Sequence, residues 1–246
     1  MADAQYDASP RHKARIAGAL YLAVIVLGLY AEMFVRGPFI VSGDAAATAR
    51  NIMAHEGVWR MAFAADLLAD AFYVAVTVIL YELLRPVNRS LSLTAAAVSL
   101  MGISLWAVGA LFHLAPLIAL SGAPYMAAFT PGQLQALAYA AIRLHSQADT
   151  VGVVFFGGYC AMIGWLIFRS RFMPRFVGVL LMLAGAGYLI DAFSIFLAPS
   201  LDLFTYIFPF TLAGEGSLTL WLLVVGVDTA RWRERAVAAP VPEPAV

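Results

Sequence analysis

Long apolar runs alternate with short polar connections along the 246-residue chain. Six of these runs have the roughly 20 mostly apolar residues that a helix needs to cross a bilayer core of about 30 Å. The runs are continuous and rich in Leu, Ala and Val, whereas barrel strands alternate apolar and polar positions. We therefore predict an all-α fold, an integral membrane bundle of six transmembrane helices. The predicted spans are residues 16–35, 59–84, 91–120, 146–168, 176–197 and 206–227.

A single membrane domain is expected, since no polar stretch is long enough to separate two domains. We place this domain at residues 15–230, after a cytoplasmic tail at residues 1–14. Residues 231–246 contain Pro-Val-Pro-Glu-Pro and are expected to form a disordered cytoplasmic tail. Glu32 and Phe34 interrupt the small-residue pattern of a signal-peptide cleavage site, so we expect the first span to be retained.

Two short external helices are expected between the spans. Asp44 is a good N-cap for the helix-forming residues 45–55. Thr130, Pro131 and Gln133 have the pattern of a capping box with proline at the first helical position. Apolar residues follow them at helical spacing, so we expect the second external helix to lead into the fourth span.

The basic residues are distributed unevenly between the two sides of the predicted bundle. Eleven of the fifteen Lys and Arg residues fall in the tail before the first span, in the turns after the second and fourth spans, and in the tail after the sixth. Because cytoplasmic loops carry an excess of Lys and Arg, we predict that both termini are cytoplasmic.

Composition excludes several other classes of protein. The chain is 63% hydrophobic and 12% charged, with a mean hydropathy of +0.85, which excludes a water-soluble globule and a disordered chain. The net charge is zero, so no basic surface for nucleic acid is indicated. Cys160 is the single cysteine, which excludes a disulfide scaffold, and its apolar helix predicts an inert thiol. The lipid bilayer is the expected partner.

Ionisable residues within the predicted spans are the strongest functional signal. A charge at the centre of a membrane helix costs about 2.5–3.5 kcal/mol on insertion scales, so each one needs a physical reason. With the predicted orientation, eight ionisable side chains lie at the middle of the membrane or outward of it. They are Glu32, Asp66, Asp70, His113, His145, Asp149, Asp191 and Glu215. Buried carboxylates of this kind must be protonated, hydrated or bound to a cation. We expect the helix faces that carry these ionisable residues to face one another and not the lipid.

Structural roles for the same residues stay open. Asp66 can form an ion pair with Arg60 or Arg36 near the outer surface. His113 can bind a backbone carbonyl freed by Pro116, and His145 with Asp149 can be hydrated at the interface. Stripes of small residues, mostly glycine, also allow close helix packing.

Several motifs resemble those of a known family. The turn after the fourth span continues into the fifth as Arg-Ser-Arg-Phe-Met-Pro-Arg-Phe-Val-Gly-Val-Leu-Leu at residues 169–181. Further matching motifs are Leu-Arg-Pro-Val-Asn-Arg at residues 84–89, Gly-Ala-Gly-Tyr-Leu at residues 185–189, and Gly-Glu with Leu-Thr-Leu-Trp in residues 214–221. Through them the chain resembles a bacterial multi-pass membrane family catalogued as domain of unknown function 4386. The resemblance implies an integral protein of the bacterial inner membrane and transfers no activity.

Three functions are compatible with these patterns. The first is proton- or cation-linked binding or transport of a small molecule through an outward-facing acidic cavity. Its candidate carriers are Asp66, Asp70, Asp191, Glu215 and Glu32. The second is a non-catalytic role as a sensor or as a partner in a membrane complex.

The third function is that of a metal-dependent intramembrane hydrolase. Histidines and a carboxylate on neighbouring spans can bind zinc and leave an open position for water. Here His113, His145 and Asp149 would be the ligands, and Glu32 or Asp66 the base. A variant of this hypothesis places haem between His113 and His145.

Overall fold

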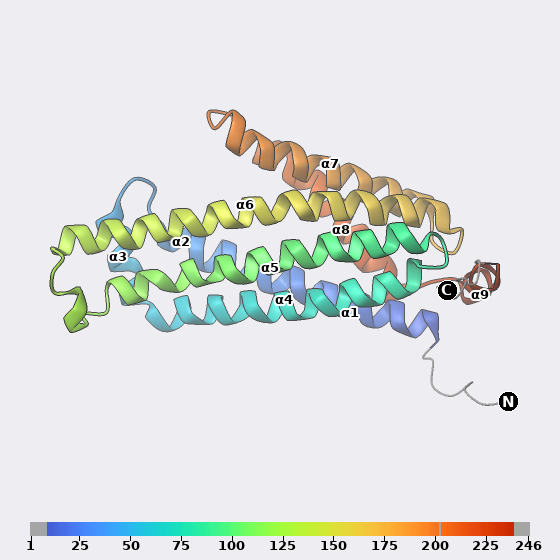
Figure 1. Cartoon of the computed structure of the whole chain (residues 1–246), viewed down its shortest axis with the longest axis horizontal. Helices are drawn as coiled ribbons and strands as arrows, with labels where there is room; N and C mark the ends of the chain where they lie inside the picture. The colour runs from blue at the N-terminus through green and yellow to red at the C-terminus, as the bar shows by residue number, and fades with distance from the viewer. Residues whose placement is uncertain (1–8, 202, 239–246) are drawn as a thin grey trace, which may run out of the picture. The chain divides into compact units, whose positions relative to one another are not determined.

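The computed structural model describes residues 9–201 and 203–238, and all regular structure in these residues is helical. Six helices are long and apolar enough to cross a membrane, which confirms the predicted all-α, six-span fold (Figure 1). The first of them is a continuous run over Pro10–Phe39. The elements are α1 (Pro10–Leu29), η1 (Tyr30–Arg36), α2 (Gly37–Phe39), α3 (Ala45–Ala54), α4 (Glu56–Leu84), α5 (Arg89–Ala119), η2 (Pro124–Met126), α6 (Pro131–Ser170), α7 (Arg175–Leu197), α8 (Phe204–Val224) and α9 (Thr229–Val237).

The chain forms two compact units, and four of its long helices contribute residues to both. The first unit comprises Met1–Leu22, Val74–Leu100 and Val153–Val246. The second comprises Ala23–Tyr73 and Met101–Gly152.

In the first unit, α7 packs closely against both α6 and α8 (Figure 1). Two glycine pairs lie where α6 meets α7. A Cβ placed on Gly164 would lie 2.6 Å from the Gly178 carbonyl oxygen, and one on Gly185 would lie 2.6 Å from that of Gly157. Only residues without a Cβ allow these backbones to come so close, which is the packing expected of small-residue stripes in membrane helices.

The second unit has a core of buried residues around Trp59. That core consists of Ala31, Val35, Ile52, Trp59, Ala62, Leu117 and Ile142. Near its end, in this unit, the first span contains the π-helical segment η1. This conformation is rare overall and occurs mostly at functional sites.

The two helix starts predicted from capping residues are present. The Asp44 side chain accepts a hydrogen bond from the Ala47 amide at 2.8 Å and begins α3. The Thr130 hydroxyl accepts one from the Gln133 amide, and the Gln133 side-chain oxygen accepts one from the Thr130 amide. The expected second external helix is continuous with the fourth span in α6, because no glycine or proline interrupts residues 133–151.

After the sixth span the chain forms a further helix, α9, which includes residues 231–237 at the start of the tail that we expected to be disordered. Asp228 caps α9 by accepting a hydrogen bond from the Arg231 amide, and the Trp232 ring nitrogen donates to the Leu83 carbonyl. These contacts give a polar segment a fixed helical conformation. Residues 239–246, which contain the proline-rich part of the predicted tail, lie outside the described residues.

Candidate metal site

Two buried histidines of the second unit each bind a backbone carbonyl. His113 lies on α5 with 1% of its surface exposed, and His145 lies on α6 with 4% exposed. The Nε2 atom of His113 is 2.9 Å from the Trp59 carbonyl oxygen, and the Nδ1 atom of His145 is 3.1 Å from that of Gly109. A carbonyl oxygen can only accept, so these two nitrogens carry the ring protons. In the neutral rings the lone pairs therefore lie on His113 Nδ1 and His145 Nε2.

The orientation of His113 is fixed by a reciprocal contact with Trp59. The Trp59 ring nitrogen donates to the His113 carbonyl at 2.7 Å, while His113 donates to the Trp59 carbonyl. The two rings stack with centroids 4.1 Å apart and an interplanar angle of 8°. Rotation of His113 would break these contacts, so its second nitrogen has a defined direction.

The other two ring nitrogens, His113 Nδ1 and His145 Nε2, are buried and form no hydrogen bond among the described residues, but the Asp149 carboxylate lies 3.3 Å from His145 Nε2. Asp66 on α4 forms a cluster with the two histidines. One ring nitrogen of each histidine and one Asp66 carboxylate oxygen lie within 4.8 Å of one another. Two imidazoles and a carboxylate, brought together from three helices, form a donor set that suits a divalent transition metal.

The Asp66 carboxylate also holds a buried arginine. Arg36, at the end of η1, reaches Asp66 with both terminal nitrogens, at 2.7 and 3.3 Å, and Glu32 with Nε at 2.7 Å. The Arg36 side chain is 10% exposed and that of Asp66 17%, whereas that of Glu32 is 65% exposed. Of the two ion pairs considered for Asp66, the one with Arg36 is present, while Arg60 pairs with Glu56 at 2.7 Å.

Asp149 lies beside the cluster on α6. Its carboxylate is 3.3 Å from His145 Nε2, and its backbone carbonyl accepts a hydrogen bond from the Trp106 ring nitrogen. Asp70, one turn along α4 from Asp66, is half-buried.

The other two acidic candidates belong to the first unit. Asp191 lies on α7 and Glu215 on α8. The Glu215 carboxylate accepts hydrogen bonds from the hydroxyls of Tyr21, at 3.1 Å, and Tyr188.

The sequence singled out the histidines, the acids and the possible Asp66–Arg36 ion pair, but not the groups that orient the histidines. The carbonyls of Trp59 and Gly109 leave no signal in a sequence, because every residue has one. The second contact of Arg36, with Glu32, does have a signal, since the two residues are four apart, the spacing of an ion pair along a helix.

Six apolar helices with ionisable residues buried between them define a multi-pass membrane protein. The chain belongs to the family described as "Domain of unknown function (DUF4386)", whose profile matches residues 16–226. It is also 28% identical over 153 residues to an uncharacterized protein of Archaeoglobus fulgidus, an alignment that covers 62% of this chain and 76% of the relative. No solved structure matches the chain.

Proposed function

We propose that this protein is a membrane metalloprotein that binds one zinc ion through Asp66, His113 and His145 and uses the metal for hydrolysis. The observation that carries the proposal is the grouping of one ring nitrogen from each buried histidine with an Asp66 carboxylate oxygen, all within 4.8 Å of one another. A buried polar atom without a hydrogen bond costs free energy, and a bound cation would remove that cost at His113, whose Nδ1 has no partner among the described residues.

The surroundings of the histidines resemble those of known metal ligands. A metal-binding histidine almost always donates its other ring N–H to a carbonyl or a carboxylate, which fixes the tautomer. His113 and His145 both do so, through Trp59 and Gly109. Ligand atoms around a tetrahedral zinc lie roughly 3.4 Å apart, so side-chain rotations would have to contract this cluster when zinc binds.

The local charge also favours a cation. Glu32 and Asp66 both bind the Arg36 guanidinium, and Asp149 lies next to His145, so three carboxylates accompany this arginine and the two histidines. Asp66 can bind Arg36 and a metal at once because a carboxylate has about four acceptor positions. We assign Asp66 as the carboxylate ligand and Asp149 as the group beside the metal.

Zinc held by Asp66, His113 and His145 would supply an activated water for hydrolysis, as catalytic zinc sites with three protein ligands do. We assign Asp149 as the group that would accept a proton from the attacking water and return it to the leaving oxygen or nitrogen of an ester or amide as that bond breaks.

Cation-linked transport has less support from the geometry. Its five acidic candidates are divided between the two units, and Asp66 and Glu32 are already bound to Arg36. The metal site requires only residues of the second unit.

Zinc affinity of the detergent-purified, chelator-treated protein tests the proposal. We expect one zinc per chain in competition with a chromogenic chelator, and at least tenfold weaker binding in His113→Gln, His145→Gln and Asp66→Asn. His55→Gln is the matched control, because exposed His55 belongs to the same unit and lies outside the cluster. Absence of zinc binding in the wild type, or equal affinity in all four variants, would refute the site.

A further inference from the structure

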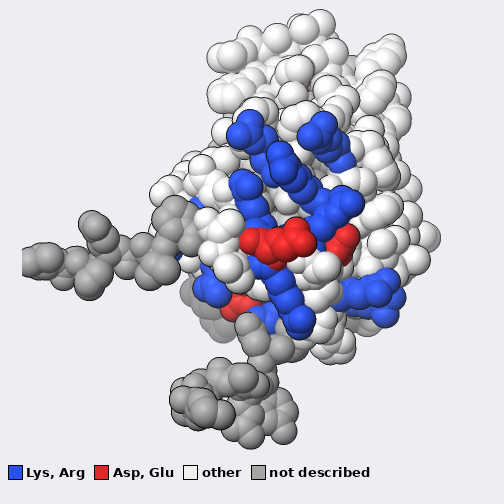
Figure 2. Space-filling model, turned by 90° about the vertical axis from the view of Figure 1, so that its right-hand side faces the viewer, with Lys and Arg blue, Asp and Glu red and all other residues white. Residues whose placement is uncertain are grey.

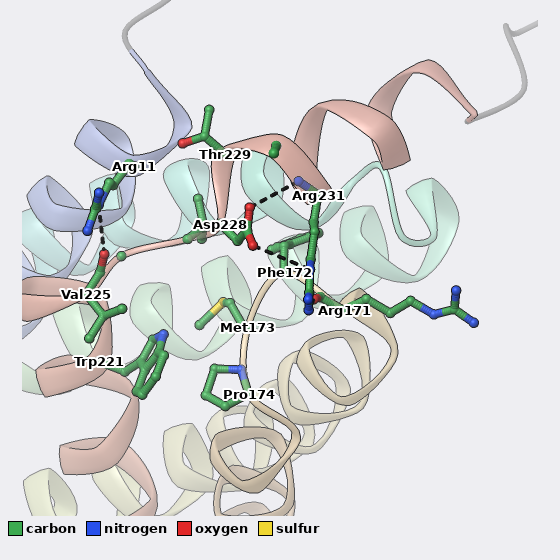
Figure 3. Close-up of a pocket in the computed structure, with 13 residues that line it drawn as sticks. Arg11, Arg171, Phe172, Met173, Pro174, Trp221, Val225, Asp228, Thr229 and Arg231 are labelled. Carbon is green, nitrogen blue, oxygen red and sulfur yellow. Dashed lines mark hydrogen bonds and ion pairs between the residues drawn. The ribbon is translucent and has the colours of Figure 1, made fainter.

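A cavity in the first unit lies where its membrane-spanning helices end (Figure 3). It has a volume of about 590 Å³. The start of α1, the turn between α6 and α7, the end of α8 and the start of α9 contribute its walls. It is independent of the metal site, whose residues all belong to the second unit.

Positive charge prevails on the walls of this cavity. Arg11, Arg171 and Arg231 line it with Asp228 as the single acid among the lining residues. Arg11 donates through Nε to the Val225 carbonyl at 3.1 Å, and Arg231 donates to the Arg171 carbonyl at 3.2 Å and lies 3.4 Å from Asp228. Each guanidinium has five N–H donors, so both arginines retain donors for an anion. The Arg171 side chain extends outward from the rim (Figure 3).

The floor of the cavity is apolar and contains one unused donor. Phe172 and Met173 are almost fully buried, and Trp221 lies below them on α8 (Figure 3). The Trp221 ring nitrogen is buried and has no acceptor among the described residues. A buried indole N–H usually finds an acceptor, so this atom is available as a donor to a ligand oxygen.

The wider surface around the cavity is also basic. Figure 2 shows Lys and Arg side chains gathered on this face of the first unit, with few acidic ones between them. Basic residues next to membrane-spanning helices attract anionic lipids, and basic pockets between such helices hold their headgroups.

We propose that this cavity binds the headgroup of an anionic phospholipid, with Arg11 and Arg231 on the phosphate and the apolar floor against the glycerol and upper acyl chains. A lipid fits better than a free phosphate ion because the cavity joins a cationic rim to an apolar floor at the level where the helices leave the membrane. The buried Trp221 N–H is then a donor to a phosphate or ester oxygen.

Native mass spectrometry of the delipidated full-length protein with short-chain phospholipids tests this proposal. We expect one dioctanoyl phosphatidylglycerol to bind at least tenfold more tightly than dioctanoyl phosphatidylcholine. Arg11→Gln and Arg231→Gln should each weaken phosphatidylglycerol binding about tenfold, the loss of one charge-assisted contact. Trp221→Phe, which removes only the N–H donor and a ring edge, should weaken it by a smaller factor.

Arg233→Gln is the matched control, because Arg233 lies on α9 but does not line the cavity. This variant should bind phosphatidylglycerol as the wild type does. Equal binding of the two lipids, an equal loss in the control, or equal competition by inorganic phosphate would overturn the assignment to an anionic lipid.

Discussion

Arg36 and Arg60 each follow a glutamate by four residues and pair with it, yet their surroundings differ. Arg36 is buried and also binds Asp66, whereas the side chains of Arg60 and Glu56 are 58% and 44% exposed. Removal of one partner of a buried pair leaves an uncompensated charge, while an exposed pair is largely replaced by water. At the scale of single residues, burial therefore decides which arginine the fold depends on.

We expect Arg36→Gln to lower the free energy of unfolding by about 3–5 kcal/mol, because it leaves Asp66 buried without its cation. Arg60→Gln, the same substitution in the same unit, should lower it by about 0.2–1 kcal/mol. Chemical unfolding in detergent, followed by tryptophan fluorescence, measures both values. Similar losses of unfolding free energy in the two variants would contradict this account, because they would mean that water replaces the Arg36–Asp66 ion pair as easily as an exposed one.

Part of the candidate site was predictable at this scale. His113, His145 and Asp66 are identified by their position within apolar runs, since an ionisable residue there is costly. The expectation that polar faces meet did not specify which residues come together, because spacing gives the face of a helix but not its rotation against its neighbours. The pairing of His113 with the Trp59 carbonyl depends on that rotation.

At the scale of elements, hydropathy located the spans well and their ends less well. The predicted fifth span at residues 176–197 agrees with α7, which covers Arg175–Leu197. The helix α6 begins at Pro131, well before the predicted fourth span at residue 146, because apolar character reports the extent of the lipid contact and not the extent of the helix. The π-helical turn of η1 was unpredictable, since it changes hydrogen bonds but not the apolar pattern.

The α6–α7 contact allows a test of element packing. We expect Gly164→Ala to lower the free energy of unfolding by about 1–3 kcal/mol, because overpacking forces backbones apart. Its new Cβ would lie 2.6 Å from the Gly178 carbonyl oxygen and 2.7 Å from the Met182 side chain.

Gly158→Ala is the control on the same helix. Its Cβ would meet its nearest neighbour, a Val98 methyl group, at 3.9 Å, an ordinary contact. Alanine is the better helix former, so the control should be neutral or slightly stabilising. Thermal unfolding in detergent compares the two, and an equally stable Gly164→Ala protein would contradict the close packing of α6 on α7.

At the scale of the whole molecule, the basic residues and the acidic candidates are distributed differently. The eleven Lys and Arg residues that predict the orientation all belong to the first unit. The acids are divided, with Glu32, Asp66 and Asp70 in the second unit and Asp191 and Glu215 in the first. The sequence predicted the charge asymmetry because this asymmetry depends only on which connections between the spans carry the Lys and Arg residues. It could not predict the division of the acids, which depends on tertiary packing.

The charge asymmetry predicts cytoplasmic termini. In a Cys160→Ser background, Gln133→Cys should react with a membrane-impermeant maleimide added to intact bacterial cells, and Arg233→Cys should react only after lysis. Gln133 and Arg233 are exposed in the structure, so burial does not protect either position. The reverse labelling pattern would place the termini outside.

The zinc site is the central claim, and X-ray absorption at the zinc edge reads its ligands directly. Protein loaded with one equivalent of zinc should show a first shell of nitrogen and oxygen at about 2.0–2.1 Å. Imidazole scattering should accompany that shell and decrease in His145→Gln. A sulfur shell at about 2.3 Å, a shell without imidazole, or failure to retain zinc would contradict a metal centre built by Asp66, His113 and His145.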